Sequence, residues 1–279
     1  MDTTYSTTIR AEGMVYSHNL TLHLRASDYA KHFHNDCEFL YFIDGAGDYV
    51  VEERRYRVTS GDLMLIPPGK YHFLDAPDGR RYERFVLHAS PAFFSDPTLL
   101  ARTAEVSACF LLSDYPLIRE ALEGLVSEEK RYAPADFALL ARSTLERVML
   151  SLLYTYDARI PNEGENSPLV TAALGYISAH LPEIKCADDV ARGIYASVST
   201  LMHGFQKQMQ IPLMRYVRIK KILEADRLLS EGVRATDAAE RAGFSDYTAF
   251  YRLYRRHFGR APRESRARRT GTGDTPARI

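Results

Sequence analysis

Four side chains that commonly bind metals or small polar molecules occur early in the chain. His32, His34 and Glu38 lie in the segment HFHNDCE, and His72 follows a Gly-Pro-rich turn. On an extended strand the first three would share one face, because strand side chains alternate. Three imidazoles and one carboxylate suit Fe, Mn, Zn, Ni or Cu. A metal-free pocket or plain core histidines are the alternatives, and the expected pocket-lining residues of the same strand parity are Leu40, Phe42 and Leu74.

A second distinctive stretch, TDAAERAGFSDYTAFYRLYRRHFGRAP, lies near the end of the chain. It predicts a helix, a turn at Gly243, a cap at Ser245-Asp246 and a second helix. Thr248, Arg252 and Arg255 lie on a polar, cationic face of that second helix, opposite the predicted buried face of Phe250, Leu253, Tyr254, His257 and Phe258. A short capped helix of this kind suits the major groove of DNA.

Composition and length limit the classes of protein to consider. The 279 residues, with 46% apolar and 26% charged side chains, are enough for two globular domains. No apolar run is long enough to span a bilayer and no signal peptide is evident, so we expect a cytoplasmic protein without a membrane partner. Cys37, Cys109 and Cys186 lack zinc-finger or disulfide spacing.

The charge is divided unevenly along the chain. Residues 167–279 carry 19 Lys/Arg and 11 Asp/Glu, a net charge of +8, whereas residues 1–166 carry −8. This asymmetry indicates that only the C-terminal part meets a polyanion.

The elements that must position these residues differ between the two halves. From about Leu20 to Leu87, short apolar runs separated by turn residues predict a β-sandwich or barrel. Helices are predicted at 115–131, 134–156, 169–181, 187–194, 198–209, 213–230, 236–242 and 247–258. The wide apolar stripe over 134–156 favours one seam of an antiparallel homodimer, with an ordinary core helix as the alternative. The fold class is α+β with two domains.

The predicted domain boundaries follow from composition. A β-barrel at 1–110 precedes a helical dimerisation segment at 111–158, and IPNEGENSP marks a linker at 159–168. An all-α domain at 169–266 precedes a disordered tail at 267–279.

The all-α domain contains the helix-turn-helix pattern twice. DDVARGIYASVSTLMHGFQKQM precedes TDAAERAGFSDYTAFYRLYRRH, and each copy has an alanine in its first helix, a serine cap and core positions four residues apart. The predicted helix 213–230 between them is about 27 Å long. A spacer of this length can hold two recognition helices about one DNA turn apart, about 34 Å.

This domain resembles the DNA-binding domain of AraC/XylS-type transcription regulators over about 95 residues, most specifically in AGFSDYTAFYRLYRRHFGRAPRESR. The resemblance implies base-reading roles for Ser199, Met202, His203, Thr248, Ala249 and Arg252. Arg252 is the strongest candidate, because a guanidinium can bind guanine bidentately. Phosphate contacts are expected from Lys207, Lys220, Arg255 and Arg256. Tyr195 departs from the usual Gly in the first turn, and the first recognition helix lacks an outward Arg, so we expect the second motif to contribute more affinity.

The N-terminal segment resembles both halves of the cupin signature, a small β-barrel. The resemblance places His32, His34, Glu38 and His72 at metal-ligand positions, while Ala26 and Ala76 depart from the pattern at positions that bind no metal. One divalent transition metal is therefore an expected cofactor, and a metal-free effector pocket stays open as the alternative.

Together these features predict a transcription regulator, not an enzyme, that binds operator DNA as a homodimer in response to a small-molecule effector. Activation, with RNA polymerase as a further partner, is the expected output, although no motif distinguishes it from repression. The competing hypothesis is a metal-dependent cupin dioxygenase or isomerase fused to a DNA-binding domain.

Overall fold

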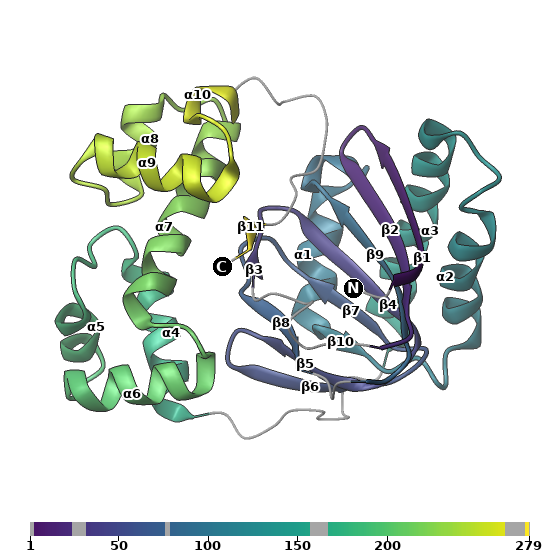
Figure 1. Ribbon diagram of the computed structural model, residues 1–279, viewed down its shortest axis with the longest axis horizontal. Coiled ribbons are helices and arrows are strands. Elements are labelled where there is room, and N and C mark those ends of the chain that lie inside the picture. Colours follow the sequence, from purple (N-terminus) through teal and green to yellow (C-terminus); the bar gives the residue numbers. More distant parts are fainter. Residues whose placement is uncertain (1–2, 24–31, 76–78, 157–166, 266–276, 279) are drawn as a thin grey trace.

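The computed structural model describes residues 3–23, 32–75, 79–156, 167–265 and 277–278. A β-rich N-terminal part lies beside a helical C-terminal part (Figure 1). The predicted α+β fold is confirmed. The predicted linker lies outside the described residues except for Ser167 and Pro168. The predicted disordered tail does so except for Ala277–Arg278, which pair with the backbone of β3.

Two antiparallel sheets form the N-terminal part. The order of the larger sheet is β1-β2-β9-β4-β7-β10 and that of the smaller is β11-β3-β8-β5-β6. The strands are β1 (Thr3–Ala11), β2 (Met14–Thr21), β3 (His32–Phe33), β4 (Cys37–Asp44), β5 (Gly47–Val51), β6 (Arg54–Val58), β7 (Leu63–Ile66), β8 (His72–Asp75), β9 (Tyr82–Ala89), β10 (Cys109–Phe110) and β11 (Ala277–Arg278).

Some of these strands differ from the prediction. The hairpin of β1 and β2 begins at Thr3, well before Leu20, where the predicted strands start, and it turns at Gly13 with φ 72°. Helix α1 (Pro97–Val106), after the short 3-10 helix η2 (Pro91–Phe93), also lies outside the predicted helices.

Each face of the larger sheet has its own core. Between the two sheets lies an inner cluster that includes Leu40, Phe42, Tyr49 and Leu74. The outer face packs against α1, α2 (Pro116–Glu128) and α3 (Pro134–Thr155), seen to the right of and behind the sheet in Figure 1. The apolar stripe of α3 is buried in this outer core, so the chain's own sheet covers it, and a homodimer through residues 111–158 stays a prediction.

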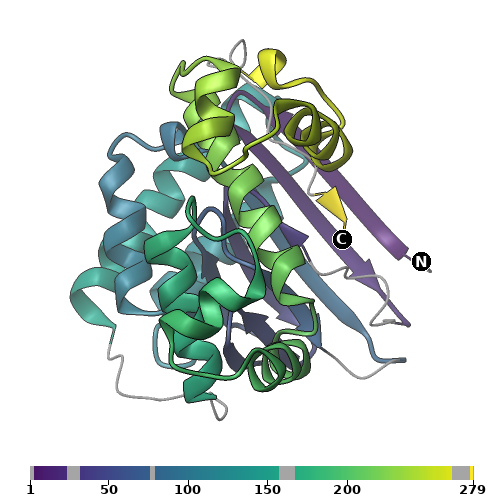
Figure 2. The same ribbon diagram turned by 90° about the vertical axis from the view of Figure 1, so that its left-hand side faces the viewer.

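The C-terminal part is entirely helical up to Ser265, and its helices begin and end within one or two residues of the prediction. They are α4 (Pro168–His180), α5 (Ala187–Gly193), α6 (Val198–Met209), α7 (Leu213–Ser230), α8 (Ala235–Arg241), α9 (Tyr247–Phe258) and the short α10 (Pro262–Ser265). We call α5 with α6 the first motif and α8 with α9 the second motif. In Figures 1 and 2, α7 runs from one motif to the other.

The barrel and the helical part share a core. Phe33 and Tyr71 of the barrel pack against Tyr216 of α7, with ring centroids 5.6 Å and 6.4 Å away. The same cluster holds Phe205 of α6 and Val50 of β5. None of the helices in the described part of the chain has the length and apolar character of a membrane span.

Candidate metal or effector site and DNA-reading helices

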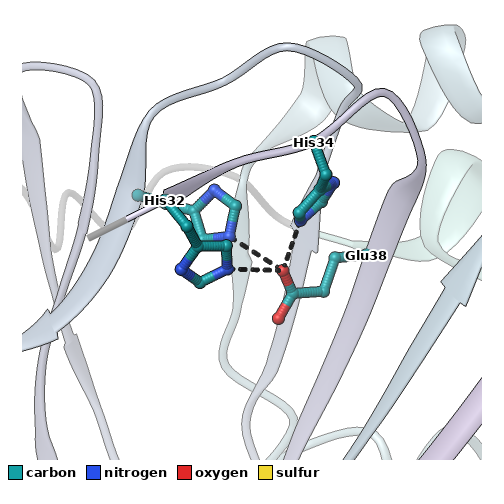
Figure 3. A group of neighbouring side chains, drawn as sticks. His32, His34 and Glu38 are labelled. Carbon is teal, nitrogen blue, oxygen red and sulfur yellow. Dashed lines mark hydrogen bonds and ion pairs between the residues drawn. The ribbon is translucent and has the colours of Figure 1, made fainter. Parts of the chain in front are cut away.

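The four predicted ligands come together at one end of the barrel. Their donor atoms lie within 4.8 Å of one another, and His34, Glu38 and His72 are buried. The Oε2 atom of Glu38 lies 2.9 Å from Nε2 of His34, 2.9 Å from Nε2 of His72 and 3.9 Å from Nε2 of His32. Figure 3 shows the imidazole rings directed at this carboxylate.

The second nitrogen of two rings is held by the backbone. Nδ1 of His34 lies 2.8 Å from the carbonyl oxygen of Asp36, and Nδ1 of His72 lies 2.8 Å from that of Lys70. A carbonyl oxygen only accepts, so both Nδ1 atoms carry hydrogen and Nε2 of the neutral ring presents a lone pair to Glu38. The lone pairs on Nε2 of His34, Nε2 of His72 and Oε2 of Glu38 therefore converge. Such an arrangement is stable only around a cation, which is either a proton on Nε2 or a metal. The residues therefore fit a divalent metal, because ligand histidines typically donate their other N–H in this way.

The electrostatics of the metal-free cluster agree with this description. Burial lowers the pKa of His34, but the hydrogen bond and charge of Glu38 outweigh it, so the pKa lies above the usual value. Burial raises the pKa of Glu38, but the charge of His72 and the hydrogen bonds of His34 and His72 outweigh it and hold that pKa well below normal. The cluster thus keeps an anionic carboxylate deep in the protein.

The predicted single strand face shared by His32, His34 and Glu38 is wrong. His32 lies on β3 and Glu38 on β4, and the backbone turns between them at Asn35 and Asp36. His32 and His72 instead face each other across the β3–β8 pair. The predicted lining residues Leu40, Phe42 and Leu74 are buried in the inner cluster, on the barrel side of the site.

Sequence reasoning missed His88 on β9. It is the cross-strand partner of Glu38, and its ring lies 4.8 Å from that of His34. Burial, first of all, lowers the pKa of His88 to about 4, so its imidazole is neutral. Nδ1 of His88 has no hydrogen-bond partner among the described residues. Only the strand register brings His88 to the site, and its sequence neighbours carry no signal for it.

Both predicted recognition helices are formed and capped. Ser197 accepts a hydrogen bond from the amide of Thr200 at the start of α6, and Asp246 accepts one from Thr248 at the start of α9. The buried positions of α6 are Leu201, Phe205 and Met209, and those of α9 are Phe250 and Tyr254. The predicted base-reading residues are exposed on the opposite faces, namely Ser199, Met202, His203, Thr248, Ala249 and Arg252.

Three of the four predicted phosphate contacts, Lys207, Arg255 and Arg256, are exposed near these faces. Lys220 has a different environment. Its Nζ donates to the carbonyl oxygen of Gly69 in the barrel, 2.7 Å away, and lies 3.6 Å from Oε1 of Glu52. In this arrangement Lys220 joins the two domains, and its contact with DNA stays a prediction.

The loop that carries His34 also contacts α7. The side-chain amide of Asn35 donates to Oδ2 of Asp226, 2.8 Å away, and to the carbonyl oxygen of Leu223. Asp226 is buried and accepts hydrogen bonds from Tyr254 and Ser265 of the second motif region. The cluster, α7 and the second motif are therefore connected by consecutive contacts.

Comparisons with known proteins agree with this architecture. A family model described as an AraC-like ligand binding domain matches residues 20–140, and one described as a helix-turn-helix domain matches residues 190–268. The chain is similar to the HTH-type transcriptional activator RhaS of Escherichia coli, with 24% identity over 257 residues that cover 89% of this chain and 91% of RhaS.

Two solved structures are also similar to this chain. ToxT from Vibrio cholerae covers 91% of this chain and 97% of its own, with 12% identity and a TM-score of 0.39. An AraC-type regulator from Chromobacterium violaceum covers 37% of this chain and 92% of its own, with 28% identity and a TM-score of 0.35.

A ligand-binding domain followed by two helix-turn-helix motifs defines a DNA-binding transcription regulator that responds to a small molecule. The chain belongs to the AraC family of these regulators.

Proposed function

We propose that this regulator binds one divalent transition metal through His32, His34, Glu38 and His72, and that occupancy of the barrel by metal and effector controls DNA binding. The observation that carries the metal assignment is the orientation of His34 and His72, whose Nδ1–H groups donate to backbone carbonyls while both Nε2 atoms meet Glu38. When bound, the metal would supply the positive charge that the converging acceptors require. It would also offer a coordination position to a polar group of the effector.

The effector is expected to enter the barrel beside this cluster. Leu40, Phe42 and Leu74 offer the apolar lining and the metal offers a polar anchor, the usual combination in small-molecule sites. The chain is similar to RhaS, which is a transcriptional activator. This similarity supports a regulator in preference to a cupin enzyme, and it supports activation as the output. RNA polymerase is then a partner, and the cytoplasm, where a bacterial chromosome lies, is the place of action.

The switch would act through the contacts between the barrel and α7. Asn35 lies next to His34 and bonds to Asp226, and Gly69, whose amide donates to the carbonyl of His34, accepts from Lys220. A ligand that binds differently to the docked and released arrangements shifts the balance between them. In the released arrangement Lys220 becomes available for a DNA phosphate.

On DNA, Arg252 would read a guanine and the other exposed positions of the two recognition helices would read neighbouring bases. Lys207, Arg255 and Arg256 would bind phosphates and set affinity without sequence preference. We further propose a homodimer formed by residues 111–158. Leu139, Leu150 and Tyr154 support this, because they are exposed apolar side chains on α3 outside the buried stripe.

Metal analysis of protein purified without chelators or nickel resin tests the proposal. We expect about one metal per chain in the wild type and only traces in His32→Ala and His72→Ala. The matched control is His180→Ala, an exposed histidine that pairs with Glu183 away from the cluster and should leave the metal content unchanged. Substoichiometric metal that none of these substitutions alters would contradict the metal site and favour the metal-free pocket.

A further inference from the structure

Lys221, next to the interdomain Lys220, is buried inside the helical part with 5% of its surface exposed. Its Nζ donates to the carbonyl oxygens of Ile184 at 2.7 Å, Gly243 at 3.0 Å and Pro182 at 3.3 Å. An ammonium group has three N–H donors, and three backbone acceptors satisfy all of them. Such a matched set of charge-assisted bonds fixes the geometry of the groups it joins.

The three carbonyls belong to different parts of the DNA-binding domain. Pro182 and Ile184 lie in the segment between α4 and α5, which leads into the first motif. Gly243 is the turn between α8 and α9 in the second motif. Lys221 itself lies in the middle of α7, so one side chain joins the turn of the second motif and the segment that leads into the first motif to the helix between them.

The backbone of Gly243 also packs directly against Pro182. This residue has φ 84°, and a Cβ atom there would lie 2.1 Å from the carbonyl oxygen and 2.6 Å from Cα of Pro182. Only glycine permits this approach, because any side chain would meet backbone that cannot move aside. The turn of the second motif thus rests directly on the segment before the first motif.

We propose that Lys221 is a positioning residue that fixes the orientation of the two recognition helices, and that it thereby restricts the protein to operators with one spacing between half-sites. The two motifs pack on α7 in two separate apolar clusters, and Lys221 adds a link between the turn of the second motif and the segment that leads into the first. One inserted base pair moves a half-site by about 3.4 Å and rotates it by about 35°. A rigid pair of readers cannot follow that movement, whereas a loosened pair can.

Selection from a random duplex DNA library by the full chain tests this proposal. Wild type is expected to select two short motifs at one fixed separation. Lys221→Met should select the same motifs at several separations. With the selected site and a one-base-pair insertion as probes, wild type should lose about 100-fold in affinity and Lys221→Met less than about 10-fold, since a rigid linker confers avidity only at the matching span.

Two further variants control the experiment. Lys185→Met removes an exposed charge from the same segment and should keep the wild-type spacing. Gly243→Ala breaks the contact from the opposite side and should broaden the spacing as Lys221→Met does, so it decides the matter if Lys221→Met fails to fold. Unchanged fixed spacing in a folded Lys221→Met or Gly243→Ala protein would overturn the proposal. A wild type that selects no motif would overturn sequence-specific DNA reading and this proposal with it.

Discussion

The two helix-turn-helix motifs are built alike but are supported differently. The first motif belongs to a cluster that also contains Phe33, Val50, Tyr71 and Phe73 of the barrel, so its packing depends on another domain. The second motif has a cluster of its own, formed with the C-terminal half of α7. Its polar centre is Asp226, which accepts from Tyr254, Ser265 and Arg260.

The turn residues of the two motifs also differ in backbone strain. Gly243 provides the left-handed turn of the second motif, whereas Tyr195 has φ 56° in the first and is 99% exposed. The recognition helix of the second motif is capped by Gly259 with φ 69°, and that of the first is capped by Gln210 with φ 54°. The second motif thus packs on an apolar cluster that contains no barrel residue, whereas the first shares its core with the barrel and has a left-handed non-glycine residue in its turn.

The largest expected effect concerns the polar centre of the second motif. Asp226→Ala should lower the free energy of unfolding by about 3–5 kcal/mol, because it removes the buried charged acceptor that Tyr254, Ser265 and Arg260 share. Urea unfolding followed by circular dichroism measures this change. Glu224→Ala, which removes a surface ion pair from the same helix, is the control and should cost about 1 kcal/mol or less. Equal losses in the two variants would contradict the role of Asp226 as the polar centre of the second motif.

The next largest effect is expected on the exposed, base-reading faces of the two recognition helices. Arg252→Ala should weaken operator binding by about 1–3 kcal/mol and leave binding to random DNA nearly unchanged, because a base contact is lost and no phosphate contact is. Met202→Ala in the first motif should cost less, since a thioether makes no bidentate base contact. Fluorescence anisotropy with operator and random duplexes measures both. An equal loss for Arg252→Ala on the two DNAs would refute its base-reading role.

A smaller effect should follow from loosening the first motif alone. The hydroxyl of Tyr216 donates to Oε2 of the buried Glu52, 2.6 Å away in the barrel. Tyr216→Phe should cost about 1.5 kcal/mol, the value of a hydrogen bond to a charged group. Hydrogen exchange should then rise in residues 198–209 and stay unchanged in 247–258. Tyr247→Phe, an exposed tyrosine, is the control, and a uniform rise along both helices would show that the barrel supports the two motifs equally.

The smallest effect tests the strained turn. Tyr195→Gly should raise the melting temperature by about 2 °C, because relief of the left-handed backbone outweighs the entropy that glycine adds to the unfolded chain. Gly243→Ala is the reciprocal substitution and should lower the melting temperature. Thermal unfolding of both variants gives the answer. A lower melting temperature for Tyr195→Gly would mean that its side chain stabilises the turn.

Much of the helical part could be predicted because its signals are local. Ser197, Asp246 and Gly243 act within a few residues, so α6, α7 and α9 begin and end where the sequence indicates. The barrel was predicted less completely, because strands pair with residues far away in the sequence. The alternation of apolar and polar residues in β1 and β2 does not show which strands they pair with. The four ligands were predicted from residue type and family resemblance, and their convergence depends on pairing between β3 and β8.

The sequence by itself determined the class of this protein. The repeated helix-turn-helix pattern, its outward Arg252, the basic C-terminal half and the histidine-rich segment are all legible from residue types and short spacings. Only the tertiary structure decided what these parts touch. In the structure His88 pairs with Glu38 across neighbouring strands and Lys220 donates to a carbonyl of the barrel. Lys221 links the turn of the second motif to the segment before the first. Such contacts join residues far apart in the chain, and burial with backbone hydrogen bonding, not local propensity, selects them.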